Sequence, residues 1–160
     1  MQQKVYIETS VVSYLTARAS RDILVAARQE VTAELWSKLS SSGFAPYVST
    51  LVHQEARRGD PEQAKKRIEA LSSLAVLDID EEAQVLAQSI LAAKVIPAEY
   101  PDDALHMAVA AVNGMDVLVT WNFAHLNNPL ARARIRQAIE AHGYRCPEVC
   151  SPEELLEIDV

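Results

Sequence analysis

The stretch that most restricts the fold is residues 101–126, PDDALHMAVAAVNGMDVLVTWNFAHL. Pro101 and an acidic first turn are typical of a helix start, and the apolar residues that follow recur at helical spacing. Gly114 marks the end of this helix. The next run, Val117 to Thr120, is apolar and β-rich, as in a strand buried on both faces of a parallel sheet. This order of helix, turn and buried strand is typical of an α/β fold.

The rest of the chain repeats this alternation of short β-rich runs and helical patterns. We expect one domain over residues 1–160, because this length is usual for a single domain. The fold class is predicted to be α/β, a three-layer α/β/α sandwich with a mostly parallel central sheet. Ser151 and Glu154 match the capping box of a short final helix. Further strands are expected at residues 5–7, 47–48, 76–79 and 144–150, the last as an edge strand broken by Pro147.

The composition excludes several classes of protein. The apolar runs are far shorter than the roughly 20 residues that a membrane span needs, and the N-terminus does not resemble a signal peptide. We therefore expect a cytoplasmic protein with no membrane partner. The net charge of −7 argues against the broad basic surface of a nonspecific nucleic-acid binder. Cys146 and Cys150 fit neither a zinc ribbon nor a CxxC redox pair, and they are expected to be reduced structural thiols.

Three carboxylates occur where this fold brings strand ends together. Glu8 follows the first strand, Glu55 lies one to two turns into the helix after the second strand, and Asp103 opens the later helix. Taken singly, each glutamate also fits a solvated surface position. In open α/β sheets, however, ligands bind at the edge formed by the carboxyl ends of the strands. Three acids at one edge repel each other, and a divalent cation relieves that repulsion. Oxygen ligands point to Mg²⁺ or Mn²⁺.

Other polar residues are expected near the same edge. Asn122 follows the strand at 117–120, and the hydroxyl of Ser10 is placed to support Glu8 or a phosphate. Asp102 is expected to cap its helix. His125 is a candidate for contacting a phosphate or ordering a water. His106 stands one helical turn after the helix-opening aspartate, as either a second ligand or a structural histidine.

Two helical patterns predict how the surfaces of their helices are used, one for packing and one for contact with solvent or phosphates. Over residues 22–41 the apolar positions, beginning with Ile23, fall on one side, which is expected to pack on the sheet. The helical pattern at 59–74 carries the basic triplet KKR at 65–67. Such a triplet is usually a solvated face. The alternative is a patch that contacts phosphates, aided by Arg57 and Arg58.

Several other chemistries lack their motifs. The chain has no GxGxxG, no P-loop, no GxSxG elbow and no HExxH, so dinucleotide, P-loop and serine-hydrolase chemistry are disfavoured. A flavodoxin-like or receiver-like domain also carries acids at strand ends. No lysine or phosphate-binding loop stands in a suitable place for that alternative.

Four segments, in this order, resemble the signature segments of the PIN domain family: VYIETSVVSYL, STLVHQE, PDDALHMAVAA and VLVTWNFAHL. The resemblance runs from about Val5 to Leu126. This family comprises magnesium-dependent ribonucleases and includes the VapC toxins of bacterial toxin-antitoxin pairs. The resemblance therefore implies an endoribonuclease that hydrolyses RNA phosphodiester bonds, pairs with a small antitoxin protein and forms a homodimer.

Carried over by motif, the acidic positions of the family fall on Glu8, Glu55, Asp103 and Asn122. The resemblance implies that the first three bind Mg²⁺ or Mn²⁺ and that Asn122 is an auxiliary ligand or orients a water. Glu8 replaces the usual aspartate. Asn122 replaces a usual acid, for which Asp102 would partly compensate. This second departure keeps open another class of function, a PIN-fold module that binds RNA or a protein without cutting.

Overall fold

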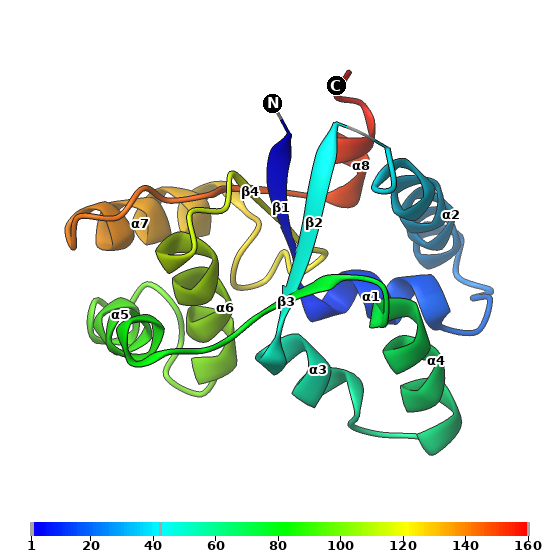
Figure 1. Ribbon diagram of the computed structural model, residues 1–160, viewed down its shortest axis with the longest axis horizontal. Coiled ribbons are helices and arrows are strands. Elements are labelled where there is room, and N and C mark those ends of the chain that lie inside the picture. The colour runs from blue at the N-terminus through cyan, green and yellow to red at the C-terminus, as the bar shows by residue number, and fades with distance from the viewer. Residues whose placement is uncertain (1, 42, 160) are drawn as a thin grey trace.

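A parallel sheet of five strands forms the centre of the molecule, in the spatial order β3-β2-β1-β4-β5. The computed structural model describes residues 2–41 and 43–159. All neighbouring strand pairs are parallel, and helices cover both faces, which confirms the predicted three-layer α/β/α fold (Figure 1). The strands are β1 (Gln3–Ile7), β2 (Phe44–Ser49), β3 (Ala75–Leu77), β4 (Val117–Val119) and β5 (Glu148–Cys150).

Six of the helices form two layers, one on each face of the sheet, and two short helices lie outside these layers. One layer holds α1 (Thr9–Thr16), α2 (Ile23–Lys38) and α4 (Pro61–Leu71), and the other holds α5 (Glu81–Ala92), α6 (Pro101–Val112) and α7 (Pro129–Glu140) (Figure 1). The short helix α3 (Thr50–Ala56) lies below the carboxyl end of β2, and α8 (Pro152–Leu156) lies beside α2. Among the residues described, no helix is both long and apolar enough to cross a membrane.

Several strand limits differ from the prediction: β1 begins at Gln3 instead of Val5, and β3 ends at Leu77 instead of Ile79. β2 begins at Phe44, earlier than expected, because its pairing with β1 already starts opposite Gln3. β5 lies at the edge of the sheet and begins only at Glu148, after the predicted break at Pro147, so the predicted start at residue 144 was wrong. Pro147 immediately precedes it, and a proline has no N–H to donate to a neighbouring strand.

The helix starts confirm one capping prediction and correct another. Ser151 and Glu154 form the predicted capping box at the start of α8. The N-cap of α1 is Glu8 itself, whose carboxylate accepts from the backbone N–H of Ser10. The prediction that Asp102 caps α6 was wrong, since the helix starts without any side-chain cap. The N-cap position is Tyr100, and Asp102 lies inside the first turn of the helix, where it adds a negative charge near the helix N-terminus.

Candidate metal centre

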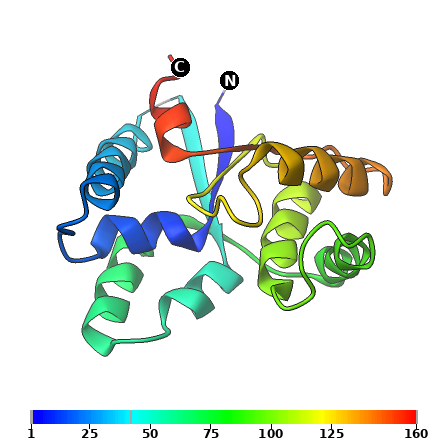
Figure 2. The same cartoon turned by 180° about the vertical axis from the view of Figure 1, so that it is seen from behind.

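The candidate site lies where the chain reverses its direction across the sheet. From β1 the chain moves outward to β2 and β3, and it then returns to β4 on the other side of β1. In open α/β sheets, ligands bind outside the carboxyl ends of the strands at such a point. Glu8 directly follows β1, and Thr120 directly follows β4. The loop after β4 lies between α1 and α6, which contribute the other polar residues (Figure 2).

Glu8 is a buried carboxylate held by its own helix start and by the neighbouring strand. Its residue exposure is 6%. One carboxylate oxygen accepts the Thr120 hydroxyl at 2.5 Å, and the other accepts the Ser10 backbone N–H at 3.1 Å. The Ser10 hydroxyl in turn accepts the Trp121 backbone N–H at 2.9 Å. These bonds fix the carboxylate at the carboxyl edge of the sheet, with no lysine or arginine among its described ion-pair partners.

Glu55 meets Glu8 through a buried histidine. Its Oε1 lies 2.5 Å from Nε2 of His106 and accepts the Thr9 hydroxyl at 2.6 Å. The same Nε2 lies 3.9 Å from Oε2 of Glu8. His106 is fully buried. Within residues 2–41 and 43–159, Glu8, Glu55 and His106 form the one group of three or more acidic, histidine or cysteine side chains whose ligand atoms lie within 4.8 Å of one another.

The other ring nitrogen of His106 belongs to a buried hydrogen-bonded chain. Nδ1 shares a hydrogen bond of 2.6 Å with the Tyr6 hydroxyl, which is 2.8 Å from the Ser49 hydroxyl. The Ser49 oxygen also accepts the Val52 backbone N–H at the start of α3. Tyr6 comes from β1, Ser49 from the end of β2, and His106 from α6. The chain therefore ties three elements together directly beneath the two glutamates.

The electrostatics of this cluster favour a negatively charged Glu55 paired with a positively charged His106. Burial alone would raise the pKa of Glu55, but the hydrogen bond and positive charge of His106 lower that pKa on balance. Burial alone would lower the pKa of His106, but the hydrogen bond to Glu55 and the charges of Glu8, Glu55 and Asp103 raise it. Burial raises the pKa of Tyr6 far above its ordinary value, so its hydroxyl stays protonated. In the absence of a cation, His106 thus holds the positive charge that the acids require.

Asp103 lies one turn before His106 on α6 but has a different partner. Its Oδ2 is 2.8 Å from Nδ1 of His125, and its side chain is 16% exposed. The ring of Tyr100 packs against the imidazole of His125, with centroids 4.0 Å apart. The structure therefore brings Glu8 and Glu55 together, whereas the carboxylate of Asp103 lies outside their cluster and is paired with His125 of the loop after β4.

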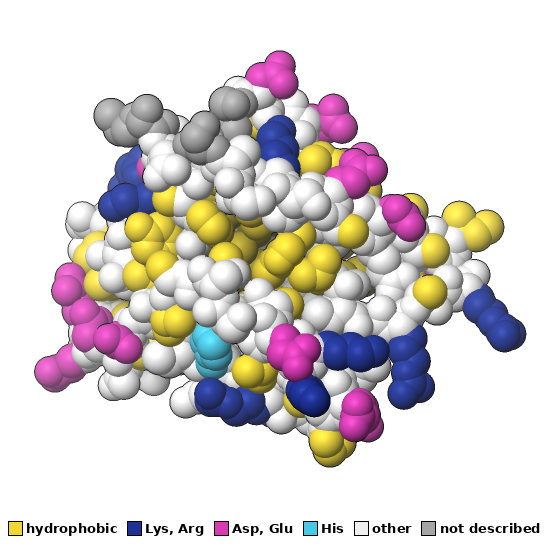
Figure 3. Space-filling view, turned by 45° about the vertical axis from the view of Figure 1, so that its right-hand side comes forward, with side chains coloured by type: hydrophobic (Ala, Val, Ile, Leu, Met, Phe, Trp, Pro, Cys, Tyr) yellow, Lys and Arg dark blue, Asp and Glu magenta, His cyan; other side chains and the backbone are white. Residues whose placement is uncertain are grey.

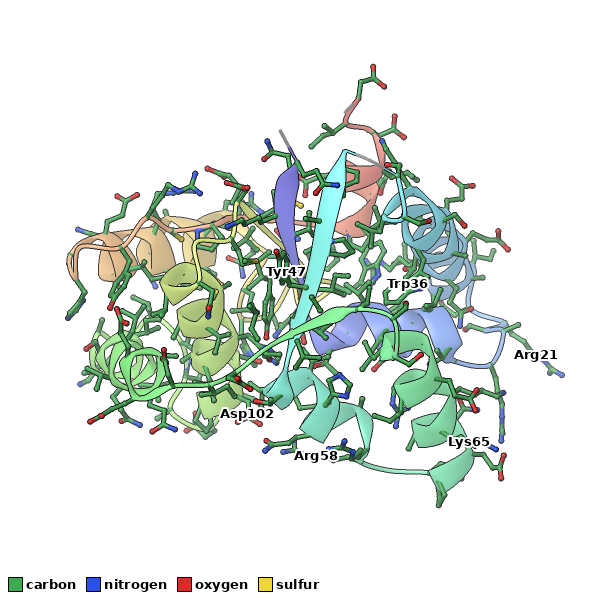
Figure 4. All side chains as sticks on the ribbon, in the orientation of Figure 1. Arg21, Trp36, Tyr47, Arg58, Lys65 and Asp102 are labelled. Carbon is green, nitrogen blue, oxygen red and sulfur yellow. The ribbon has the colours of Figure 1, made fainter. Side chains whose placement is uncertain are left out.

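Asn122 stabilises a local turn, and Asp102 forms an ion pair with another helix end. The Asn122 side-chain oxygen accepts the His125 backbone N–H at 3.1 Å, which closes the turn after β4. Asp102 lies 3.6 Å from the Arg58 guanidinium, and both side chains are partly or largely exposed. Figure 4 shows this pair near the lower end of α3 and α6. Both side chains therefore have partners outside the cluster of Glu8, Glu55 and His106.

The residues present suit a divalent cation. Two carboxylates and an imidazole converge, and none of the described ion pairs joins Glu8, Glu55 or Asp103 to a lysine or arginine. Buried carboxylates at such spacing need a positive partner, because their mutual repulsion is strong where water is excluded. Carboxylate oxygens are the ligands that Mg²⁺ and Mn²⁺ prefer, and imidazole nitrogen is also accepted by Mn²⁺ and its neighbours.

A family model described as the PIN domain matches residues 5–125. The chain belongs to the PIN domain family. No curated protein matched the sequence. Solved structures that share the fold of this PIN domain include the following two. One is VapBC2 from Rickettsia felis bound to a DNA fragment from their promoter, with 13% identity and a TM-score of 0.59, covering 93% of this chain and 98% of that chain. The other is Mycobacterium tuberculosis VapC20, a Sarcin-Ricin loop cleaving toxin, with 19% identity and a TM-score of 0.53, covering 81% of this chain and 94% of that chain.

Sequence reasoning about this PIN domain missed the polar partners that hold the glutamates. Thr120 and Tyr6 were predicted only as residues of buried strands, and Thr9 was not among the predicted site residues. The available signal was a hydroxyl in an otherwise apolar strand, since a buried tyrosine usually finds a hydrogen-bond partner. Its partner, His106, is 100 positions away along the chain, so the sequence does not indicate the pairing.

Proposed function

We propose that this PIN domain is a metal-dependent endoribonuclease and the toxin of a type II toxin-antitoxin pair, with its 160 residues acting as one domain. The family supports nuclease activity, and both similar structures are of VapBC or VapC proteins. The observation that carries the proposal is the convergence of Glu8 and Glu55 at the carboxyl edge of the sheet, with no lysine or arginine among their described ion-pair partners.

Glu8, Glu55 and Asp103 would hold Mg²⁺ or Mn²⁺. When bound, the cation would polarise a phosphoryl oxygen and lower the pKa of a water molecule, as phosphodiester hydrolysis requires. Thr120 and the Ser10 N–H orient the carboxylate of Glu8, and Thr9 orients that of Glu55. This arrangement keeps the carboxylates in fixed positions before substrate arrives.

Groups beside the cluster of Glu8, Glu55 and His106 are available to position RNA. His125 is paired with Asp103 and is only partly buried, so its ring can contact a phosphate or a water there. Lysine and arginine side chains gather along the lower edge of the face in Figure 3, where α3 and α4 lie in Figure 1. Arg57 and Arg58 at the end of α3 are exposed. We propose that they contact backbone phosphates, which carry no sequence information but fix the position of the strand.

The proposal extends to partners and location. The toxin would act on cellular RNA in the cytoplasm, pair with a small antitoxin protein and form a homodimer. Support for the antitoxin comes from the similar fold of VapBC2, and support for RNA as substrate comes from the family and from the similar fold of VapC20.

The test is cleavage of a mixed RNA pool with Mg²⁺ or Mn²⁺. Glu55→Gln and Asp103→Asn are expected to reduce the rate at least about 100-fold, because the loss of even an outer partner of a metal ligand typically costs 10–100-fold. The matched control is Glu34→Gln. Glu34 is an exposed glutamate on α2 that takes part in none of the described ion pairs, so this variant should retain the full rate. Equal cleavage by all four proteins would remove the assigned site.

A second function, binding RNA or a protein without cutting, rests on Asn122. Its side-chain oxygen is engaged by the His125 N–H, so the family's fourth acidic position supplies a turn in this chain. Calorimetric titration with Mn²⁺ separates the two functions. Failure to bind at millimolar concentration, together with retained RNA binding, would favour the binding module.

A further inference from the structure

The metal centre proposed above contains a buried imidazole that the acidic pattern of the family does not include. We propose that His106 is a nitrogen ligand of the bound cation, so that the core of the site is Glu8, Glu55 and His106. This inference rests on the proposed function only in that both place a cation at this edge of the sheet.

The Nε2 atom of His106 lies between the two glutamates. It lies 2.5 Å from Oε1 of Glu55 and 3.9 Å from Oε2 of Glu8, in a side chain that is fully buried. Neighbouring ligands of an octahedral ion with bonds of 2.0–2.1 Å lie about 3 Å apart. The two distances fall on either side of that value. Shifts of a few tenths of an ångström to about one ångström would therefore suit a shared ion.

The imidazole ring of His106 is held in place through its other nitrogen, Nδ1. A histidine that binds a metal almost always engages its other nitrogen with a hydrogen-bond acceptor, which fixes the ring orientation and the proton. Nδ1 of His106 meets the Tyr6 hydroxyl at 2.6 Å, and that hydroxyl meets Ser49 at 2.8 Å. If Nδ1–H donates to Tyr6 and the Tyr6 O–H donates to Ser49, the Nε2 lone pair faces the two glutamates.

The site has fewer free oxygen ligands than the acidic pattern of the family would provide. Asn122 stands where the family usually has an acid, and its oxygen is used by the turn after β4. Asp103 is paired with His125. The nitrogen of His106 restores a donor within the buried cluster. Because imidazole suits transition metals better than Mg²⁺, the site should prefer Mn²⁺ over Mg²⁺.

The experiment is pulsed electron paramagnetic resonance of the full chain loaded with Mn²⁺ alone. The electron spin of the ion should show modulation from a directly bound ¹⁴N nucleus, and protein labelled with ¹⁵N-histidine should show the ¹⁵N pattern in its place. This comparison needs no substitution, so it does not depend on the folding of a variant. A bound Mn²⁺ with no nitrogen coupling would overturn the proposal.

Variants then assign the nitrogen. His106→Gln should abolish the coupling and lower the ratio of Mn²⁺ to Mg²⁺ affinity by about 10–100-fold, whereas Tyr6→Phe should keep the coupling and weaken Mn²⁺ binding. The matched control is His142→Gln, at the far end of α7, which should change neither. Coupling that survives His106→Gln in folded protein and disappears in His125→Gln would refute the assignment.

The same preparation distinguishes the two proposals. RNA cleavage with Mn²⁺ but without nitrogen coupling would leave the nuclease standing and remove His106 from the ligands. Nitrogen coupling without cleavage would do the reverse. Absence of any bound Mn²⁺ at millimolar concentration would overturn both.

Discussion

The Tyr6 hydroxyl lies in the middle of a fully buried hydrogen-bonded chain, which makes Tyr6→Phe a direct test of that chain. The change removes one oxygen and leaves the ring. It deletes the bonds to Ser49 and His106, at 2.8 Å and 2.6 Å. Ser49 keeps the Val52 N–H as a partner, whereas Nδ1 of His106 loses the only partner the structure describes for it.

The expected loss of stability follows from these contacts. A net hydrogen bond contributes about 0.5–1.5 kcal/mol, and a buried polar atom left without a partner costs about 1–3 kcal/mol. We therefore expect Tyr6→Phe to lower the free energy of unfolding by about 2–3 kcal/mol. For a chain of this size, that corresponds to a fall in Tm of about 4–12 °C. Urea unfolding of the metal-free protein measures it, with an unchanged m-value.

A matched control lies directly opposite in the sheet. Tyr47 on β2 pairs with Tyr6 in the register of the sheet, is labelled in Figure 4, and makes no side-chain hydrogen bond within the described residues. Tyr47→Phe should change stability by less than about 0.5 kcal/mol. If Tyr6→Phe is no more destabilising than Tyr47→Phe, the buried chain does not stabilise the fold as argued.

Three further predictions concern titration and metal. First, burial raises the pKa of the Cys146 and Cys150 thiols from 9.0 to about 11 and about 12, so the thiolate populations fall about 100-fold and 1000-fold. Iodoacetamide should therefore label native protein at pH 8 far more slowly than protein in urea, and equal rates would contradict this burial. Second, the lowered pKa of Glu55 stabilises the metal-free fold above an unfolded pKa of about 4.5, and the raised pKa of His106 stabilises it below about 6.5. Stability measured in EDTA should thus fall as the pH drops through the folded pKa of Glu55 or rises through that of His106. A Glu55→Gln profile identical to that of the wild type would refute the pairing. Third, Mn²⁺ at 100 times its Kd should raise the free energy of unfolding by about 2.7 kcal/mol, seen as a higher Tm, and Glu8→Gln should abolish the rise.

Most of the fold could be predicted because it depends on local chemistry. Pro101 and the apolar spacing of α6 indicate a helix wherever it lies in space, and Gly114 beyond its end adopts a φ of +68°, which glycine tolerates. The apolar runs of β1 and β4 indicate buried strands for the same reason. Local pattern failed at the start of α2, where Ile23 was predicted to pack on the sheet but is 87% exposed. Leu24 is also exposed, at 59%, because periodicity does not indicate where along a helix its packing partners end.

The site was predictable only as a position in the fold. Parallel strands bring their carboxyl ends to one edge, so the placement of Glu8 near Glu55 follows from the order of strands and helices. Which side chain meets which does not follow. The contact between His106 and Glu55 joins residues 51 apart, and that between Thr120 and Glu8 joins residues 112 apart.

The sequence by itself determined the layered fold, the parallel sheet and the edge at which acidic residues collect, because hydrophobic periodicity, helix caps and turn residues act over a few positions. The tertiary structure alone decided that His106 points between two glutamates and that Asp103 pairs with His125. The physical reason is that a side chain takes its orientation from the atoms packed around it. At this site those atoms come from β1, α3, α6 and the loop after β4, which meet only when the sheet has formed.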